Sequence, residues 1–168
     1  MPAGYWTELK LQLKIWLCLG AIMLLAWAAT MVISDYQLET YVRAGMHAEA
    51  LNLRATLMAT RRIYHQQFLA SGLPLTDQTI GFLPAHAMSR ISRDFSNWAD
   101  SGVRFNNVSD RPRNPENRAD PDELRAMDWF RHNPTASEYV QDIRNAEGQP
   151  YFHFAAPIWV EPYCLQCH

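Results

Sequence analysis

The last five residues of the chain combine two thiols and an imidazole in one short pattern, Cys164-Leu-Gln-Cys167-His168. Cys-x-x-Cys-His is the attachment motif of c-type haem, in which both thiols bond to the vinyl groups of the porphyrin. The adjacent imidazole of His168 can then bind the iron as the proximal axial ligand. The spacing therefore predicts covalently bound haem c, and with it iron, at Cys164, Cys167 and His168.

Two other chemistries use paired cysteines. A zinc site needs four ligands, but the third cysteine of the chain, Cys18, lies inside an apolar run far from the motif. A thioredoxin-like redox pair occurs in a βαβ context, and no such context precedes the motif. The sequence therefore favours haem c over both alternatives.

Arginines of the loop regions could contact the haem propionates. Arg104, Arg111 and Arg113 are candidates, since guanidinium groups pair well with carboxylates. Solvated loop arginines are the more ordinary interpretation of the same residues.

The sixth ligand of the iron could come from the predicted helix that begins at Pro84. His86 and Met88 lie about 200° apart around a helix, so only one of them can meet the iron. Met88 shares its face with Ile91, and we therefore expect Met88 first and His86 second. His65 is a further candidate, and an open site that binds a gas is the remaining alternative. A thioether ligand would raise the redox potential relative to an imidazole.

A membrane segment is predicted near the N-terminus. Residues Ile15 to Ile33 form a run of 19 residues without a charge, which spans roughly 28 Å as a helix and suffices to cross the hydrocarbon core. Lys10 and Lys14 precede the run, whereas Asp35 and Glu39 follow it. Positive charge is retained in the cytoplasm, so the remainder of the chain should be exported.

The predicted organisation is a cytoplasmic N-terminus over residues 1–14, a transmembrane signal anchor over 15–33 and an extracytoplasmic domain over 34–168. The expected location is the bacterial inner membrane, crossed once, with the C-terminal domain in the periplasm. A cleaved signal peptide with Ala26-Trp27-Ala28 as its cleavage site is the alternative. Both interpretations agree with haem c, which is attached on the exported side.

The exported part is expected to be an α+β domain with a small antiparallel sheet and flanking helices. A long helix should run over residues 35–71, because proline is absent there and Gly72 and Pro74 follow. A second helix is expected from Pro84 to about Asp100, with Met88, Ile91, Phe95 and Trp98 on one side, and a strand is expected over Val103–Ser109. A third helix should begin with Asp120 as N-cap, Pro121 at N1 and Glu123 at N3. The strands Ser137–Arg144 and Tyr151–Val160 should form a hairpin.

A heptad-like stripe marks the long helix. Its members are Met46, Ala50, Leu53, Leu57, Thr60 and Tyr64. The stripe could form the seam of a homodimer, or it could pack on the chain's own domain.

Composition excludes some functions. The net charge of −2 gives no electrostatic reason to expect a nucleic-acid partner. No nucleophile with a partnering base and no phosphate-binding loop is present, so we do not expect this chain to be an enzyme.

From about Pro84 to His168 the chain resembles the cyanobacterial Tll-type c-haem proteins and their relatives in bacterial sensors. The stretches that carry the resemblance are Pro84-x-x-x-Met88-Ser-Arg90, Gly102-Val-Arg104-Phe, Arg113-Asn-Pro115-x-Asn117, Asp122-Glu123-Leu and Tyr163-Cys164-Leu-Gln-Cys167-His168. The resemblance implies a PAS-like fold with one haem c, used as the periplasmic input module of membrane-bound histidine kinases or diguanylate cyclases.

The leading functional hypothesis is therefore the input domain of a membrane-bound sensor of redox state or of a small gas. The alternative is a membrane-tethered monohaem cytochrome for electron transfer. Because a sensor needs an output domain and nothing follows the haem ligand to cover it, we expect the sequence to be part of a longer protein.

Overall fold

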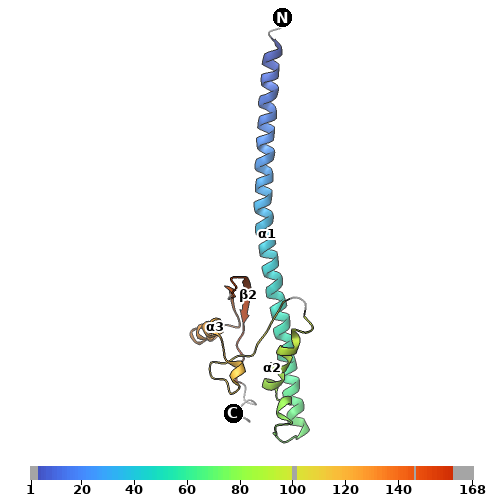
Figure 1. The fold of residues 1–168 in the computed structure, drawn as a ribbon, viewed down its shortest axis with the longest axis vertical. Coiled ribbons are helices and arrows are strands. Elements are labelled where there is room, and N and C mark those ends of the chain that lie inside the picture. The colour runs from blue at the N-terminus through green and yellow to red at the C-terminus, as the bar shows by residue number, and fades with distance from the viewer. Residues whose placement is uncertain (1–3, 100–101, 146, 161–168) are drawn as a thin grey trace. The chain divides into compact units, whose positions relative to one another are not determined.

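The structure is a computed structural model that describes residues 4–99, 102–145 and 147–160; for residues 4–9 and 85 it describes the backbone alone. Within these ranges the chain is mostly helical with a small antiparallel sheet, which agrees with the expected α+β class in outline. The chain divides into two units, Met1–Met46 and His47–His168. In chain order the elements are α1 (Gly4–Ser71), η1 (Ile80–Phe82), α2 (Pro84–Phe95), η2 (Pro115–Asn117), α3 (Pro121–His132), β1 (Tyr139–Arg144) and β2 (Pro150–Ala155) (Figure 1).

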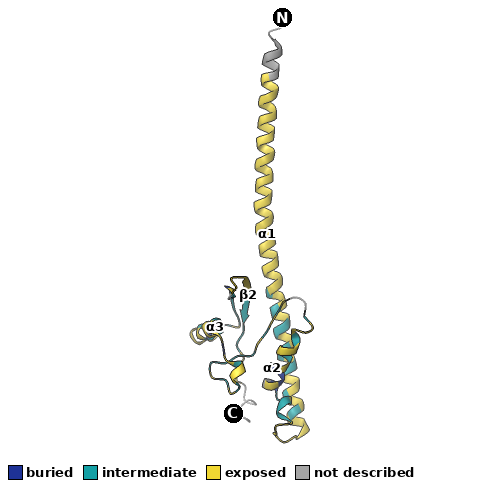
Figure 2. Cartoon of the chain, viewed as in Figure 1, coloured by how far each residue is buried: buried dark blue, intermediate teal, exposed yellow. Residues whose placement is uncertain are grey.

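The first unit is the N-terminal part of α1, whose apolar side chains are exposed (Figure 2). Trp16, Met23 and Leu25 are exposed by 72%, 72% and 71%. Such side chains are unfavourable in water and favourable in hydrocarbon. This part of α1 is long and apolar enough to cross a membrane. The finding is compatible with the predicted membrane anchor and equally with a signal sequence.

α1 continues without a break into the second unit and ends at Ser71. Proline is absent from the helix, so no residue removes a backbone donor from it. Gly72 follows with a φ of 62°, and its N–H donates to the carbonyl of Leu69 at 3.3 Å. The predicted end at residue 71 is confirmed, and the predicted membrane segment and the helix over 35–71 are one continuous element.

The heptad-like stripe on α1 is only partly buried. Its middle members are half-buried: Ala50, Leu53, Leu57 and Thr60. Met46 and Tyr64, at its two ends, are 38% and 40% exposed. An α-helix drifts by about 20° per heptad relative to a strict seven-residue repeat. Further along the helix the half-buried residues are Arg61, His65 and Phe68, and this small drift does not account for the change, because one residue corresponds to about 100° of rotation.

α2 begins at Pro84, as predicted, but ends at Phe95 instead of near Asp100. Met88 points inward and is only 6% exposed. Trp98, which we expected on the same apolar side, is 82% exposed, because it follows the end of the helix and the helical periodicity no longer places it. Its indole N–H donates instead to the carboxylate of Asp94 at 3.1 Å.

The prediction of a strand over Val103–Ser109 is wrong. The segment packs on α2 through side chains, with the rings of Phe95 and Phe105 in an edge-to-face contact at 5.2 Å between centroids. Ser109 forms an isolated parallel bridge with Arg118. A strand needs a neighbouring strand to pair its backbone groups. This segment lies against a helix instead and is held there by side-chain contacts.

α3 begins as the sequence predicts. The side chain of Asp120 accepts hydrogen bonds from the N–H groups of Asp122 and Glu123, both at 2.8 Å. The carboxylate of Glu123 accepts in return from the N–H of Asp120 at 2.8 Å, and Pro121 occupies the first turn. This capping box fixes the start of the helix, and α3 buries Phe130 on one side.

The predicted hairpin is confirmed. β1 and β2 pair antiparallel from Tyr139 opposite Ala155 to Arg144 opposite Pro150, and Gly148 has a φ of 79° in the connecting turn. β2 ends at Ala155, earlier than predicted, because Pro157 cannot donate to a ladder. Within the described residues the sheet has these two strands.

The two faces of the sheet have different neighbours. Gln141 lies opposite His153, and side chains alternate between faces, so His153 shares its face with Tyr139 and Ile143. Tyr139 contacts Trp129 of α3 at 5.3 Å between ring centroids, and Ile143 is buried. This face is therefore the one that packs on α3.

His47 of α1 contacts the hairpin on the other face. Its Nε2 lies 3.0 Å from the carboxylate of Glu138, just before β1. Its ring meets the edge of Phe154 on β2 at 5.9 Å between centroids. Phe154 is one residue from His153 and so points away from α3.

Removal of the N-cap of α3 should destabilise the domain. Asp120→Ala leaves two backbone N–H groups without their acceptor, so the free energy of unfolding should fall by about 1 kcal/mol. Urea denaturation of the full chain in detergent measures this change. Asp77→Ala, an exposed loop position, is the control and should change the free energy little. Equal effects of the two substitutions would contradict the role of the capping box.

Candidate haem site

The predicted attachment residues Cys164, Cys167 and His168 lie outside the described residues. The described chain leads toward them from β2 through an exposed apolar stretch that includes Ile158 and Trp159, which are 45% and 55% exposed. Haem attachment at these positions therefore stays a prediction from the sequence motif.

The two candidate ligands on α2 lie in different environments, as their spacing predicted. Met88 is buried, with Ala87 and Ser89 buried on either side of it. His86 is exposed. Helical geometry thus separates the two, and their roles as iron ligands stay predictions.

A second set of polar groups lies on the half-buried face of α1. Arg61 and His65 are four residues apart and therefore share this face. The Nη1 atom of Arg61 and the Nε2 atom of His65 are both buried. The sequence pattern placed the core-facing side of the helix at Tyr64, one position away, because the pattern does not show which segments pack on this part of the helix.

The other histidines differ in what their rings contact. His47 meets Glu138, as described above. His132 has its Nδ1 at 2.9 Å from the backbone carbonyl of Asp128. His153, between the sheet and α3, has a buried Nδ1 with no hydrogen-bond partner among the described residues.

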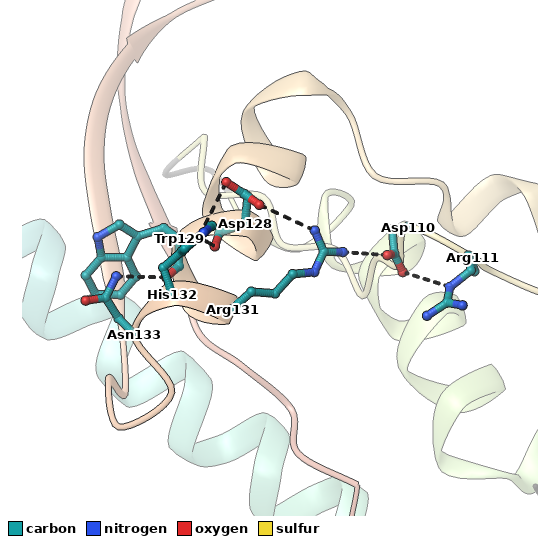
Figure 3. Close-up of polar contacts among 7 residues, drawn as sticks. All are labelled: Asp110, Arg111, Asp128, Trp129, Arg131, His132 and Asn133. Carbon is teal, nitrogen blue, oxygen red and sulfur yellow. Dashed lines mark hydrogen bonds and ion pairs between the residues drawn. The ribbon is translucent and has the colours of Figure 1, made fainter.

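The arginines proposed for the propionates are all exposed: Arg104, Arg111 and Arg113. Arg111 is 91% exposed and lies 3.9 Å from the carboxylate of Asp110. Asp110 also accepts a hydrogen bond from Arg131 at 2.6 Å, and Arg131 reaches back to Asp128 at 3.7 Å (Figure 3). This chain of surface ion pairs ties α3 to the loop before η2, and each exposed pair contributes about 0.2–1 kcal/mol.

Several residues of the recognised stretches have structural roles. The hydroxyl of Ser89 donates to the side-chain oxygen of Asn117 at 3.2 Å, and Asn114 caps η2 by accepting from the N–H of Glu116 at 3.2 Å. A Cβ at Gly81 would lie 2.9 Å from the guanidinium of Arg90. The contact of Ser89 with Asn117 holds α2, and with it Met88, against the segment of η2.

Burial shifts the pKa of two side chains that lie near the start of α3. It lowers the pKa of His153, and the guanidinium of Arg125 acts in the same direction while Asp120 opposes it. Burial also raises the pKa of Glu123, although its backbone hydrogen bond from Asp120 opposes that shift. His153 is therefore held in the neutral form more strongly than a solvated histidine.

The chemistry of the described residues fits a c-type haem. A haem needs an axial ligand, a partner for its carboxylates and apolar side chains around the ring. Met88 and His65 supply candidate ligands, and Arg61 supplies a half-buried guanidinium. Within the described ranges no three His, Cys, Asp or Glu side chains form a cluster that could hold a metal ion directly.

Comparison with known proteins gives a family. A family model described as Tll0287-like matches residues 39–168, a range that contains the second unit and the Cys-x-x-Cys-His motif. No curated protein and no solved structure matches the chain.

The buried imidazole of His153 predicts a stability that depends on pH. Its folded pKa is lowered, so the unfolded chain binds more protons as the pH falls below the unfolded value of about 6.5, and the free energy of unfolding should fall there. His153→Gln should reduce this dependence between pH 6.5 and 5, measured by urea denaturation. An unchanged pH dependence in His153→Gln would contradict the assignment.

Proposed function

Because the chain belongs to the Tll0287-like family, we propose that it carries one haem c on Cys164 and Cys167 and acts as the extracytoplasmic input domain of a membrane-bound sensor. The observation that supports haem is the Cys-x-x-Cys-His motif at the end of the matched range. His168 would be the proximal ligand. The stimulus would be redox state or a small gas, since haem iron responds to both.

The location follows from the N-terminal sequence. Lys10 and Lys14 before the apolar stretch and the acidic residues after it favour a cytoplasmic N-terminus in the bacterial inner membrane and a periplasmic domain. Haem c attachment on the exported side agrees with this orientation.

The form of α1 supports sensing over electron transfer. The helix runs from the apolar stretch into the haem domain without a proline and ends only at Ser71. A tethered electron carrier gains from a flexible linker that lets it reach its partners. A sensor gains from a stiff connection, because a small shift in its domain can then reach the membrane. The output would be a histidine kinase or diguanylate cyclase.

A homodimer fits the same proposal. α1 leaves the two ends of the heptad-like stripe exposed, at Met46 and Tyr64, which are 38% and 40% exposed. These side chains could pack against the same helix of a second copy.

When bound, the haem supplies an iron that changes its oxidation state or takes up a ligand. The chain's own residues hold and surround it. Exposed arginines, Arg111 and Arg113, remain candidates for the propionates at the rim. Met88 is buried on α2, and its burial excludes water from this part of the domain.

Covalent attachment is tested by extraction. The full chain, produced with a haem c maturation system, should keep its haem through acid–acetone treatment because thioether bonds survive it. The double substitution Cys164→Ala with Cys167→Ala should abolish this retention, whereas Cys18→Ala should leave it unchanged. Haem retained by the double variant would refute attachment at the motif.

Membrane orientation is tested with reporters. A reporter that is active only after export, fused after Gly72, should be active because the lysines hold the N-terminus in the cytoplasm. A matched reporter that is active only in the cytoplasm should be silent at the same position. The reverse pattern would place the domain on the cytoplasmic side.

A further inference from the structure

An exposed apolar stretch follows the hairpin in the second unit. Ile158, Trp159 and Val160 are consecutive residues outside any helix or strand. Their exposure rises along the chain, from 45% at Ile158 through 55% at Trp159 to 72% at Val160. Consecutive large apolar side chains are unfavourable in water, and a contiguous group of them is typical of a surface that contacts a partner. The stretch Ile158–Val160 is therefore a candidate contact surface.

The other described tryptophans of the second unit have contacts that account for their positions. The ring of Trp129 packs on Tyr139 at 5.3 Å between centroids. Trp98 is 82% exposed, and its indole N–H donates to the carboxylate of Asp94 at 3.1 Å. Trp98 is thus a surface tryptophan with a polar contact of its own, and it supplies a matched control for Trp159.

The place of the stretch in the sequence indicates what contacts it. Cys164 is five residues after Trp159 and four residues after Val160. An extended chain spans at most about 3.6 Å per residue, so the Cα of Cys164 lies within about 18 Å of that of Trp159 and within about 14 Å of that of Val160. A haem bonded to Cys164 and Cys167 stays at this range. Its contact with the stretch would be intramolecular, so even a weak apolar attraction would suffice.

The chemistry of the stretch suits a porphyrin. A porphyrin is a broad apolar ring with carboxylates at one edge, and the indole of Trp159 is a flat apolar surface that can cover part of such a ring. Ile158 and Val160 add aliphatic side chains beside it. The three residues carry no charge, so the contact would leave no ion buried without a partner.

Other exposed apolar side chains of the second unit are less well placed. Leu69 belongs to the end of α1, and Leu73, Leu75 and Phe82 belong to the segment that leads to α2. All four are far from Cys164 in the sequence. Their distance from the attachment site is not limited by a short tether, as it is for Trp159.

We propose that Ile158, Trp159 and Val160 form a contact surface for the covalently attached haem, with Trp159 against the porphyrin ring. This inference rests on the proposed haem function and extends the site to residues outside the attachment motif. Apolar side chains around a haem exclude water and so disfavour the ferric form, which carries one more positive charge. Trp159 therefore raises the midpoint potential. It positions and covers the haem and does not bind its iron.

Hydroxyl-radical labelling of the full chain in detergent tests the contact. Two forms of one sequence are compared, namely protein matured with a haem c system and protein produced without it, which carries no haem. Trypsin separates the two tryptophans, because Trp159 falls in the peptide that begins at Asn145 and Trp98 in the peptide Asp94–Arg104. Labelling of Trp159 should fall severalfold in the haem-loaded form, whereas labelling of Trp98 should stay the same. Equal labelling of Trp159 in the two forms would refute the contact.

Substitution tests the effect of the contact on the haem. In the haem-loaded chain, Trp159→Ala should lower the midpoint potential and weaken the circular dichroism of the Soret band, because the ring loses its apolar cover. Trp159→Phe should restore most of both signals, and Trp98→Ala should change neither. A midpoint potential and a Soret signal unchanged by Trp159→Ala would overturn the inference.

Covalent haem per chain, measured as the pyridine haemochrome, separates this inference from the proposed function. The variants at Trp159 and Trp98 should carry as much haem as the unaltered chain, because their attachment motif is intact. Attached haem without protection of Trp159 would reject the contact alone. No attached haem in the unaltered chain would reject the proposed function and the contact with it.

Discussion

α1 joins an apolar part and an amphipathic part in one continuous helix. The rest of the domain depends on which side chains of the amphipathic part face inward. The N-terminal part exposes apolar side chains in all directions, which suits hydrocarbon, while the part after His47 is amphipathic. The half-buried face moves around the axis between Leu53 and His65 by more than the drift of about 20° per heptad that 3.6 residues per turn gives. The segments that pack on the helix therefore decide which side chains face the domain, and they place Arg61 and His65 inward.

In the remainder of the second unit, local hydrogen bonds and side-chain contacts stabilise the structure more than a large apolar core does. Few described side chains are buried, Phe130 and Ile143 among the larger ones, and each of these two is still 8% exposed. The capping box of Asp120 and Glu123 starts α3, and side-chain contacts such as Ser89 with Asn117 fasten α2 to its loops. A domain of this kind gains stability from any apolar group fixed within it, and a covalently held porphyrin is such a group.

Elements specified by local chemistry could be predicted from the sequence. Pro84 and Asp120 mark the starts of α2 and α3, Gly72 marks the end of α1, and Gly148 lies in the hairpin turn; all are local signals. Features that depend on a distant partner were missed.

The sequence of Val103–Ser109 predicts a strand, but pairing requires a neighbouring strand that the local sequence cannot reveal. The position of His65 on the half-buried side was likewise missed, because it depends on which segments pack on α1. For the haem motif itself the sequence remains the direct support, since those residues lie outside the described part.

The central claim is that haem is bound covalently through the terminal cysteines, and peptide mass spectrometry tests it most directly. Trypsin cleaves after Arg144, so Cys164 and Cys167 fall in the peptide that begins at Asn145, separate from Cys18. In protein matured in a haem c-competent host, this peptide should carry the added mass of one haem and absorb visible light, and neither thiol should react with an alkylating reagent. The unmodified peptide with two alkylated cysteines would contradict the account.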